Sequence, residues 1–321
     1  MILFRKRKYI LKGVAGIRTE EQSGIIYTAF SYFLWGILPI YWKWLDHVPA
    51  DEILANRIFW SFWFMIVFLL VIKKFPEFWK MIKGMMRTKK KLAALAIASL
   101  LISLNWFIYI WAVNTDQMVE ASLGYYINPL VSVLLGVFIL REKMTKAQVI
   151  SFILAAAGVL VLTASYGRFP WIAVGLAVSF GLYGLAKKLI KVDSDIGLTL
   201  ETMTTAPFAL IYLIYLSSQG NISLFQLSAG TDLLLIAGGA VTAVPLLYFA
   251  KGAQRIPLYM VGFLQYIAPT ITLILGVFLY GEPFTQTHLV AFAFIWSALT
   301  IFSVSRMKRV KRRTKAQEKC A

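Results

Sequence analysis

The sequence predicts an all-α integral membrane protein in which ten transmembrane helices form two inverted five-helix repeats. Three observations support this fold class. The composition is strongly apolar, the chain contains ten apolar runs of membrane-spanning length, and a twenty-residue stretch recurs 140 residues later. A helix needs about 20 predominantly apolar residues to cross a hydrocarbon core about 30 Å thick, and the runs have about this length.

The composition separates this chain from soluble proteins. Of its 321 residues, 59% are hydrophobic and 15% are charged, and the mean hydropathy is +0.71. A soluble globular domain carries about 25% charged residues. The shortfall of charge, together with the long uncharged runs, indicates a membrane protein. The runs are continuous and do not alternate, so we expect helices to cross the membrane and not the strands of a barrel.

Ten apolar runs are expected to span the membrane. We place them at residues 24–45, 53–72, 92–112, 120–140, 147–165, 170–190, 197–217, 231–250, 257–280 and 287–305.

Lysine and arginine residues gather on one side of these spans. Thirty of the 33 fall on the side of the N-terminus, one (Arg168) falls on the other side, and Lys43 and Arg57 lie within spans. Basic loops face the cytoplasm, so both termini are expected there, including the basic tails 1–23 and 306–321. The net charge of +18 then reflects topology and contact with anionic membrane lipid, and no nucleic acid is expected as a partner.

The repeated stretch indicates two related halves. Tyr126–Thr145 matches Tyr266–Thr285 at nine of twenty positions without a gap. Five spans separate equivalent points, and because five is odd, the second copy is inverted across the bilayer. We therefore place the repeats at 24–165 and 166–305. Inverted repeats in a polytopic membrane protein are typical of secondary transporters.

Two prolines lie at equivalent points of spans four and nine, namely Pro129 and Pro269. Proline removes a backbone donor and crowds the carbonyl four residues back. In lipid such a break is tolerated only where protein or water receives the freed carbonyl. Paired helix breaks favour a central binding site, whereas kinks that serve packing alone are the alternative.

Polar side chains lie on the same helices. Facing lipid would cost free energy, so each must line a cavity or pair across helices, and both interpretations stay open for each residue. The residues expected to line a substrate cavity are Arg57, Asn105, Tyr109, Tyr125, Asn128, Gln265 and Tyr266.

Opposite charges occur at matching depth near both membrane surfaces. Arg57 lies near the outer surface with Glu120, and Lys187 and Lys188 lie near the inner surface with Glu201. We expect one ion pair to gate each mouth. Snorkelling to the surface and a counter-charge for an anionic solute are the alternatives for Arg57. Glu201 is the candidate for proton coupling, because burial within a span favours the protonated carboxyl.

No motif indicates an enzyme, a metal site or a cofactor. The single cysteine, Cys320, lies in the C-terminal tail, and His47 and His288 are far apart in the sequence. Metal sites in proteins need ligands at characteristic spacings, which these residues lack. The chain also has no glycine-rich phosphate loop followed by Lys-Ser/Thr and no nucleophile elbow.

Eight stretches carry a family resemblance: YFLWGILPIYWK at Tyr32–Lys43, EILANRIFWS at Glu52–Ser61, NWFIYIWAVN at Asn105–Asn114, EASLGYYINPLVSVLLGV at Glu120–Val137, GLYGLAKK at Gly181–Lys188, ETMTTAPFALIYL at Glu201–Leu213, GFLQYIAPT at Gly262–Thr270 and YGEP at Tyr280–Pro283. Together they resemble the RarD group of EamA-type transporters, within the drug/metabolite transporter superfamily. The resemblance covers nearly all of the membrane part. It implies two inverted five-helix EamA repeats, a central cavity, alternating access and a location in the bacterial plasma membrane.

We therefore predict a secondary transporter, acting as an exporter, that moves a small organic metabolite or drug. Its partners would be membrane lipid and the small-molecule substrate, with proton-driven and facilitated transport as open alternatives, and it would act as a monomer or homodimer. The alternative is a non-transporting polytopic sensor or assembly protein, which would need no cavity.

Overall fold

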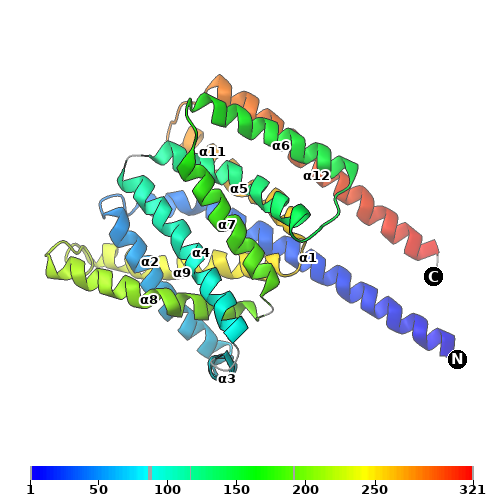
Figure 1. Cartoon of the computed structure of the whole chain (residues 1–321), viewed down its shortest axis with the longest axis horizontal. Helices are drawn as coiled ribbons and strands as arrows, with labels where there is room; N and C mark the ends of the chain where they lie inside the picture. The colour runs from blue at the N-terminus through cyan, green and yellow to red at the C-terminus, as the bar shows by residue number, and fades with distance from the viewer. Residues whose placement is uncertain (1, 86–88, 116, 191, 320–321) are drawn as a thin grey trace.

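The computed structural model is a bundle of helices whose first and last members extend well beyond the others (Figure 1). It describes residues 2–85, 89–115, 117–190 and 192–319, and most of the two basic tails lies outside the part whose side chains are described. The helices are α1 (Ile2–Lys43), α2 (Ala50–Val71), α3 (Phe75–Met85), α4 (Lys89–Asn114), α5 (Met118–Phe138), α6 (Lys146–Ser165), α7 (Trp171–Leu189), α8 (Ser194–Ser218), α9 (Ala229–Ala253), α10 (Leu258–Gln265), α11 (Ile267–Leu279) and α12 (Gln286–Lys319).

The prediction of ten spans is confirmed. Within the described residues, ten segments are long and apolar enough to cross a membrane, and each overlaps one expected run. They are Glu20–Lys43, Ala50–Val71, Leu95–Asn114, Met118–Phe138, Lys146–Ser165, Trp171–Leu189, Ser194–Ser218, Ala229–Ala253, Leu258–Leu279 and Gln286–Met307.

Both ends of the chain leave the same end of the bundle (Figure 1). We call this end the termini side and the other end the opposite side. Because the spans alternate in direction, α2 begins on the opposite side, whereas α8 begins on the termini side. The same holds for α5 and α10, which begin on the opposite side and the termini side respectively.

Helix packing follows the two inverted repeats. The repeat makes α1 equivalent to α7, α4 equivalent to α9, and α5 equivalent to α10 with α11. Accordingly, α1 packs on α9 and its counterpart α7 packs on α4. In the same way, α5 packs on α7, and α10 and α11 pack on α1. Three further contacts join equivalent helices to each other: α2 with α8, α5 with α10, and α6 with α12, which lie side by side at one edge of the bundle (Figure 1). The arrangement is that of two inverted five-helix repeats.

Small residues allow the closest helix contacts. A Cβ atom added to Gly239 of α9 would lie 2.3 Å from the carbonyl carbon of Trp60 in α2, so only glycine fits this crossing. The Ser61 hydroxyl donates to the Gly239 carbonyl at 2.9 Å. Close backbone approach through glycine, strengthened by a hydroxyl bond, is a common way to join helices in lipid. It makes α2 and α9 one tightly packed unit.

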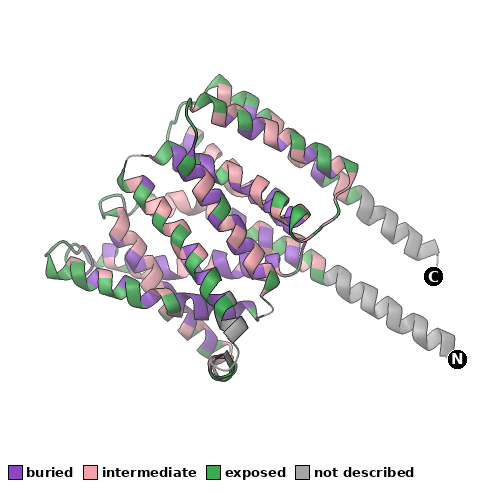
Figure 2. Ribbon diagram, in the orientation of Figure 1, coloured by how far each residue is buried: buried purple, intermediate pink, exposed green. Residues whose placement is uncertain are grey.

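Buried residues lie along the bundle interior, and the exposed ones lie mostly on its outer surface (Figure 2). The largest core cluster includes Tyr183, Phe249, Leu258 and Phe263. Large apolar side chains on the outside, such as Phe278 at 85% exposed, cover a surface that meets lipid.

A short helix between spans two and three was not predicted. Phe75–Met85 forms α3 on the termini side, where Phe78 is buried against Leu69 and Leu95 while Trp79 stays 52% exposed. Its apolar residues recur at helical spacing, which was the available sequence signal. A helix with one apolar face and lysines elsewhere suits the membrane interface.

Candidate functional site

An arginine lies among aromatic side chains on the opposite side of the bundle. The guanidinium carbon of Arg57 lies 4.4 Å from the ring centroid of Trp42 in α1. Its Nε donates to the Thr242 hydroxyl of α9 at 2.9 Å. Gly238, one turn before Thr242, lies beside the arginine stem and the Trp42 ring. Helices α1 and α9, one from each repeat, therefore hold this side chain of α2.

Two tyrosines from α4 and α5 complete this cluster. The Tyr109 and Tyr125 ring centroids are 6.4 Å apart, and both rings are within electrostatic reach of Arg57. Tyr125 is 51% exposed although its helix is inside the bundle. Arg57, Tyr109 and Tyr125 are thus the three expected cavity residues that lie together.

The two expected asparagines lie between helices instead. Asn105 of α4 donates to the Leu176 carbonyl and to the Ser179 hydroxyl of α7, each at 2.9 Å. Asn128 of α5 is 5% exposed, and its side-chain oxygen has no hydrogen-bond partner among the described residues. Asn105 therefore joins helices, and Asn128 retains an unused acceptor.

Gln265 and Tyr266 lie where span nine is interrupted, between α10 and α11. The Gln265 side chain accepts from the Ser132 hydroxyl of α5 at 3.3 Å. The Tyr266 hydroxyl donates to the Tyr126 carbonyl at 3.4 Å, and the side chain is 2% exposed. In this structure both residues connect the equivalent helices of the two repeats.

The expected pair of helix breaks is found on one side only. Span nine is divided at Tyr266, three residues before Pro269, whereas α5 runs without interruption through Pro129. The prediction of a break at Pro129 is therefore corrected. A proline can remain inside a helix where neighbours hold the distorted turn. Here α10 packs directly on it, since a Cβ on Gly262 would lie 2.7 Å from the Pro129 carbonyl oxygen.

The expected ion pair between Arg57 and Glu120 is not formed, which corrects that prediction. The Glu120 carboxylate instead accepts from the Tyr166 hydroxyl at 2.7 Å and the Ile172 backbone N–H at 2.7 Å, with Arg168 at 3.4 Å. These donors come from the turn before α7 and from its first residues, which are much nearer in the fold. A carboxylate at a helix N-terminus is favourable, so Glu120 fixes the start of α7.

The expected ion pair on the termini side is present. Lys187 of α7 and Glu201 of α8 are 2.7 Å apart, and both side chains are 3% exposed. The Tyr183 hydroxyl donates to the other Glu201 oxygen at 3.0 Å. A cavity of about 10 Å³ adjoins Glu201 and Trp106, which is room for about one water molecule. Its role as a gate or proton site stays a prediction.

A cluster of charges lies nearer the surface on the same side. Lys74 bridges Asp193 and Asp195 at 2.9 Å each, and Lys251 contacts Asp195 at 2.7 Å. Partial burial is the largest single influence on the pKa of Asp193 and raises it, but the hydrogen bond and charge of Lys74 together with backbone N–H groups outweigh burial, so the pKa is lowered overall. These contacts tie the ends of α2 and α9 to the start of α8.

Two glutamates that follow equivalent helices adopt the same local turn. The Glu142 N–H donates to the Gly136 carbonyl at 3.0 Å, and the Glu282 N–H donates to the Gly276 carbonyl at 2.9 Å. The residue before each glutamate has a positive φ, 55° and 69° respectively. In both turns a Cβ on the glycine would lie 2.6 Å from the glutamate carboxylate. Local sequence therefore builds the same structure twice.

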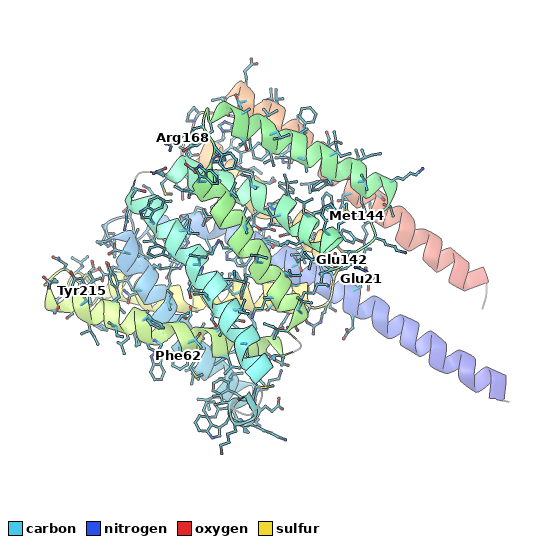
Figure 3. All side chains as sticks on the ribbon, viewed as in Figure 1. Glu21, Phe62, Glu142, Met144, Arg168 and Tyr215 are labelled. Atoms are coloured by element: carbon cyan, nitrogen blue, oxygen red, sulfur yellow. The ribbon has the colours of Figure 1, made fainter. Side chains whose placement is uncertain are left out.

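The two glutamates differ in what they bind. Glu142 accepts from the Leu258 and Tyr259 N–H groups, at 2.8 and 2.9 Å, and so caps the start of α10. Figure 3 places Glu142 toward the termini side of the bundle. Glu282 is exposed, and no described N–H group of another helix donates to it. Leu258 and Tyr259 are 0% and 4% exposed.

The helix start equivalent to that of α10 is open. The 140-residue offset that relates Glu142 to Glu282 relates Leu258 to Met118, and α5 begins at Met118 as α10 begins at Leu258. Met118 and Val119 are 45% and 69% exposed. Within residues 2–85, 89–115, 117–190 and 192–319, a carboxylate therefore caps the start of α10, whereas none caps the start of α5.

Polar contacts across the bundle follow the same asymmetry. Lys188 of α7 donates to the Ile256 carbonyl at 2.5 Å, and Gln148 of α6 donates to the Tyr259 hydroxyl at 3.5 Å. Within the described residues, hydrogen bonds and ion pairs that join α1, α2, α8, α9 and the start of α10 to α4–α7 are confined to the termini side. Figure 3 labels two residues at the opposite end of the bundle. Tyr215 belongs to α8, in the first of these helix groups, whereas Arg168 lies in the turn before α7, in the second.

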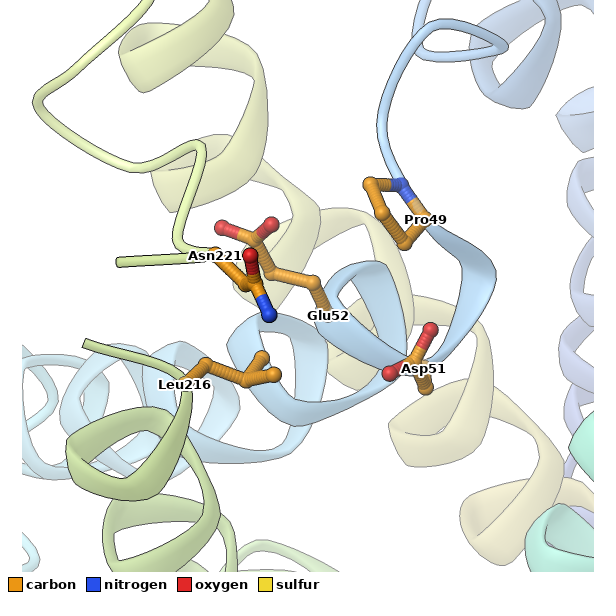
Figure 4. A pocket seen from close by; sticks show the side chains of 5 residues that line it. All are labelled: Pro49, Asp51, Glu52, Leu216 and Asn221. Atoms are coloured by element: carbon orange, nitrogen blue, oxygen red, sulfur yellow. The ribbon is translucent and has the colours of Figure 1, made fainter. Parts of the chain in front are cut away.

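Another hollow lies at the surface of the opposite side. A pocket of about 350 Å³ is lined by Pro49, Asp51, Glu52, Leu216 and Asn221 (Figure 4). Glu52 accepts from the Ser223 and Leu224 N–H groups, at 2.8 and 3.0 Å, and so holds the α8–α9 loop. None of the residues that line this pocket belongs to the cluster around Arg57. Among the described residues, no three His, Cys, Asp or Glu side chains gather as metal ligands would.

Several contacts at these sites were not predicted. Thr242, Trp42 and the caps made by Glu120 and Glu142 depend on residues far apart in the sequence. Only the repeat itself offered a signal, because it aligns Glu142 with Glu282.

The fold and these sites define a class of polytopic membrane transporters. The EamA-like transporter family matches residues 22–164. The chain is 50% identical to an uncharacterized transporter, YojE, of Bacillus subtilis, covering 90% of this chain and 96% of that protein. It is 43% identical to Protein RarD of Escherichia coli, covering 92% and 99%. A crystal structure with 20% sequence identity has the same fold, with a TM-score of 0.69 over 89% of this chain and 98% of that one.

The chain belongs to the RarD group of the EamA-like transporter family. It is a multi-pass membrane transporter of the bacterial inner membrane and not an enzyme.

Proposed function

We propose that this protein is a secondary transporter of a small organic solute, that it works by alternating access, and that its two glutamate turns close its two mouths in turn. In this proposal the termini lie in the cytoplasm, as the distribution of basic residues favours, and transport is outward. The boundaries of the two repeats are 24–165 and 166–305.

One observation carries the proposal. Glu142 and Glu282 have the same local turn, yet Glu142 caps a buried helix start, whereas Glu282 is exposed and the helix start equivalent to that of α10 has exposed side chains. Inverted repeats exchange their conformations when access alternates. In the alternate state Glu282 therefore caps Met118 and Val119 of α5, while Glu142 releases Leu258 and Tyr259.

The energetics suit a reversible switch. A carboxylate that accepts backbone N–H bonds at a helix start contributes about 0.5–2 kcal/mol per cap. The free energy lost when one cap is released is nearly balanced by the free energy gained when the equivalent cap forms. Thus the two states differ by a few kcal/mol at most, which a bound solute can overcome.

Matched substitutions test the proposal. Glu142→Gln weakens the termini-side cap and Glu282→Gln weakens only the alternate one. The reporter is a cysteine at Ser194, which is 5% exposed and bonds Gln254 on the termini side. The background carries Cys320→Ser, which removes the single native cysteine.

The expected result is that labelling rises in one variant and does not rise in the other. Glu142→Gln increases labelling of the reporter by a membrane-impermeant maleimide from the termini side, and Glu282→Gln decreases it or leaves it at its low value. An equal change in both variants, or no change in either, would refute the exchange of caps. Loss of solute flux in proteoliposomes in both variants would agree with it.

A further inference from the structure

We propose that Arg57 binds the carboxylate of an organic anion whose apolar part lies against Trp42 and Tyr125. This inference rests on the proposed transport function and names the class of substrate that the opposite-side mouth receives.

Arg57 has no counter-charge among the residues that the structure describes. A charged side chain within a span is costly and ordinarily pairs with an opposite charge. Among the described residues no carboxylate contacts Arg57, and Glu120 is instead occupied by Tyr166 and Ile172. In that same part of the chain, Nε is the one guanidinium nitrogen with a hydrogen bond, to Thr242. Guanidinium carries five N–H donors in a planar fork, so the two terminal nitrogens remain to bind a carboxylate in bidentate fashion.

A comparison with Glu201 supports the same inference. Arg57 is the eighth residue of α2 and Glu201 is the eighth residue of α8, the equivalent helix of the other repeat. On the termini side α7 supplies Lys187, and the two charges neutralise each other. On the opposite side the equivalent helix, α1, supplies the ring of Trp42. The charge that completes the site must therefore come with the solute.

Accessibility and shape also support this inference. Trp42, Arg57 and Tyr109 are partly exposed, and Tyr125 is 51% exposed. These aromatic faces around a cation form a surface that accepts a flat or apolar body beside the carboxylate. A cationic solute would meet the arginine with no carboxylate to offset it. The site therefore selects anions.

Binding of three matched probes to the purified full-length protein tests the charge preference. The probes are phenylacetate, its neutral amide phenylacetamide, and the cation phenethylamine, which share one ring and nearly one length. Thermal stabilisation and calorimetry measure affinity. The expected result is that phenylacetate binds about tenfold or more tightly than phenylacetamide, since a charge-assisted bidentate pair is lost, and that phenethylamine binds least.

Three variants locate the site. Arg57→Gln removes the preference for phenylacetate over phenylacetamide. Arg57→Lys keeps the preference with weaker binding, because an ammonium lacks the fork geometry. Arg168→Gln is the matched control: it removes an arginine on the same side whose side chain is 63% exposed, and it leaves the preference unchanged. If Arg57→Gln does not fold, Arg57→Lys and the wild-type probe series still decide.

Several outcomes would overturn the inference. These are equal affinity for the three probes, preference for phenethylamine, a preference that survives Arg57→Gln, or no binding of either phenylacetate or the larger indole-3-acetate. The labelling of Ser194 in the glutamate variants needs no ligand. If that labelling changes as expected while the probes fail, the anion site is wrong and alternating access stands; the reverse result refutes the cap exchange alone.

Discussion

The two ends of this bundle are built from equivalent helices, but among the described residues hydrogen bonds and ion pairs join α1, α2, α8, α9 and the start of α10 to α4–α7 at only one of them. On the termini side, Lys187 pairs with Glu201 and Glu142 caps α10. On the opposite side, Arg57 has no acidic partner among the described residues, and the start of α5 is exposed. The difference cannot come from the turns themselves, because those of Glu142 and Glu282 have the same backbone bonds.

This comparison separates what local sequence determines from what the conformational state determines. Local sequence sets the glycine, the residue with positive φ and the glutamate that follows it. The partner of each glutamate depends on how the two repeats lean against each other. The chain encodes the same glutamate turn at both ends of the bundle, and in this structure one of the two turns caps a helix. Such a chain is suited to alternate between the two caps.

The largest effect is expected from breaking the buried ion pair. Lys187→Met or Glu201→Met alone leaves an unpaired buried charge and lowers the free energy of unfolding by about 3–5 kcal/mol. The double substitution restores most of the loss. Chemical unfolding in detergent measures the cycle. Additive losses in the double variant would mean that the pair is not what holds the termini side together.

A second prediction concerns proton coupling through Glu201. If Glu201 carries the proton, Glu201→Gln abolishes the dependence of solute flux on the proton gradient, because the amide does not titrate. Flux into vesicles with and without an ionophore measures this. Wild-type flux that is insensitive to collapse of the gradient would remove Glu201 from this role, while its ion pair with Lys187 would still close the termini side.

The two glycines beside the glutamates sharpen the comparison further. A Cβ on Gly136 would lie 2.8 Å from the Tyr259 nitrogen of α10, whereas the three atoms nearest to a Cβ on Gly276 all belong to the exposed Glu282 side chain. Gly136→Ala should therefore cost about 1–3 kcal/mol of stability by overpacking, and Gly276→Ala about 1 kcal/mol or less. Equal costs, measured by thermal unfolding of both variants, would show that the two turns have equal surroundings.

The smallest effect is expected from the surface charges of the termini side. The pKa of Asp193 is lowered in the folded protein, so its contribution to stability is present above the unfolded pKa, about 3.9, and is lost as pH falls through the lower folded value. Lys74→Met should lower the unfolding temperature at pH 6, with a smaller difference below pH 4. Lys80→Met, an exposed lysine of α3, is the control. A difference that is independent of pH would exclude this carboxylate as the cause.

The spans were predictable because lipid demands length and hydrophobicity, both of which are written in the sequence. The Lys187–Glu201 contact was also predictable, since the two residues lie at matching depth on consecutive spans. Depth alone failed for Arg57 and Glu120, because it does not say which helices are neighbours. The turn before α7 brings Arg168 and Tyr166 to Glu120 first.

Other features depend on packing that the sequence does not display. Asn105 and Gln265 read equally well as cavity residues or as bonds between helices, and in this structure they join helices. Helix α5 is continuous through Pro129, and a glycine of α10, more than a hundred residues later, packs closely against this proline. The repeat aligns Glu142 with Glu282, but it does not say which of the two glutamates caps a helix start. That depends on which side of the bundle is closed.

The most direct test of the central claim is cross-linking of two symmetry-related cysteine pairs in the Cys320→Ser background. One pair replaces Lys143 and Tyr259 on the termini side, and the other replaces Val119 and Pro283 on the opposite side. Each pair links a glutamate turn to the helix start that it caps. The account predicts that both pairs cross-link, that the first locks the Ser194 reporter away from label, and that the second leaves it labelled. If the second pair never cross-links in membranes that transport solute, the two glutamate turns do not close the two mouths in turn.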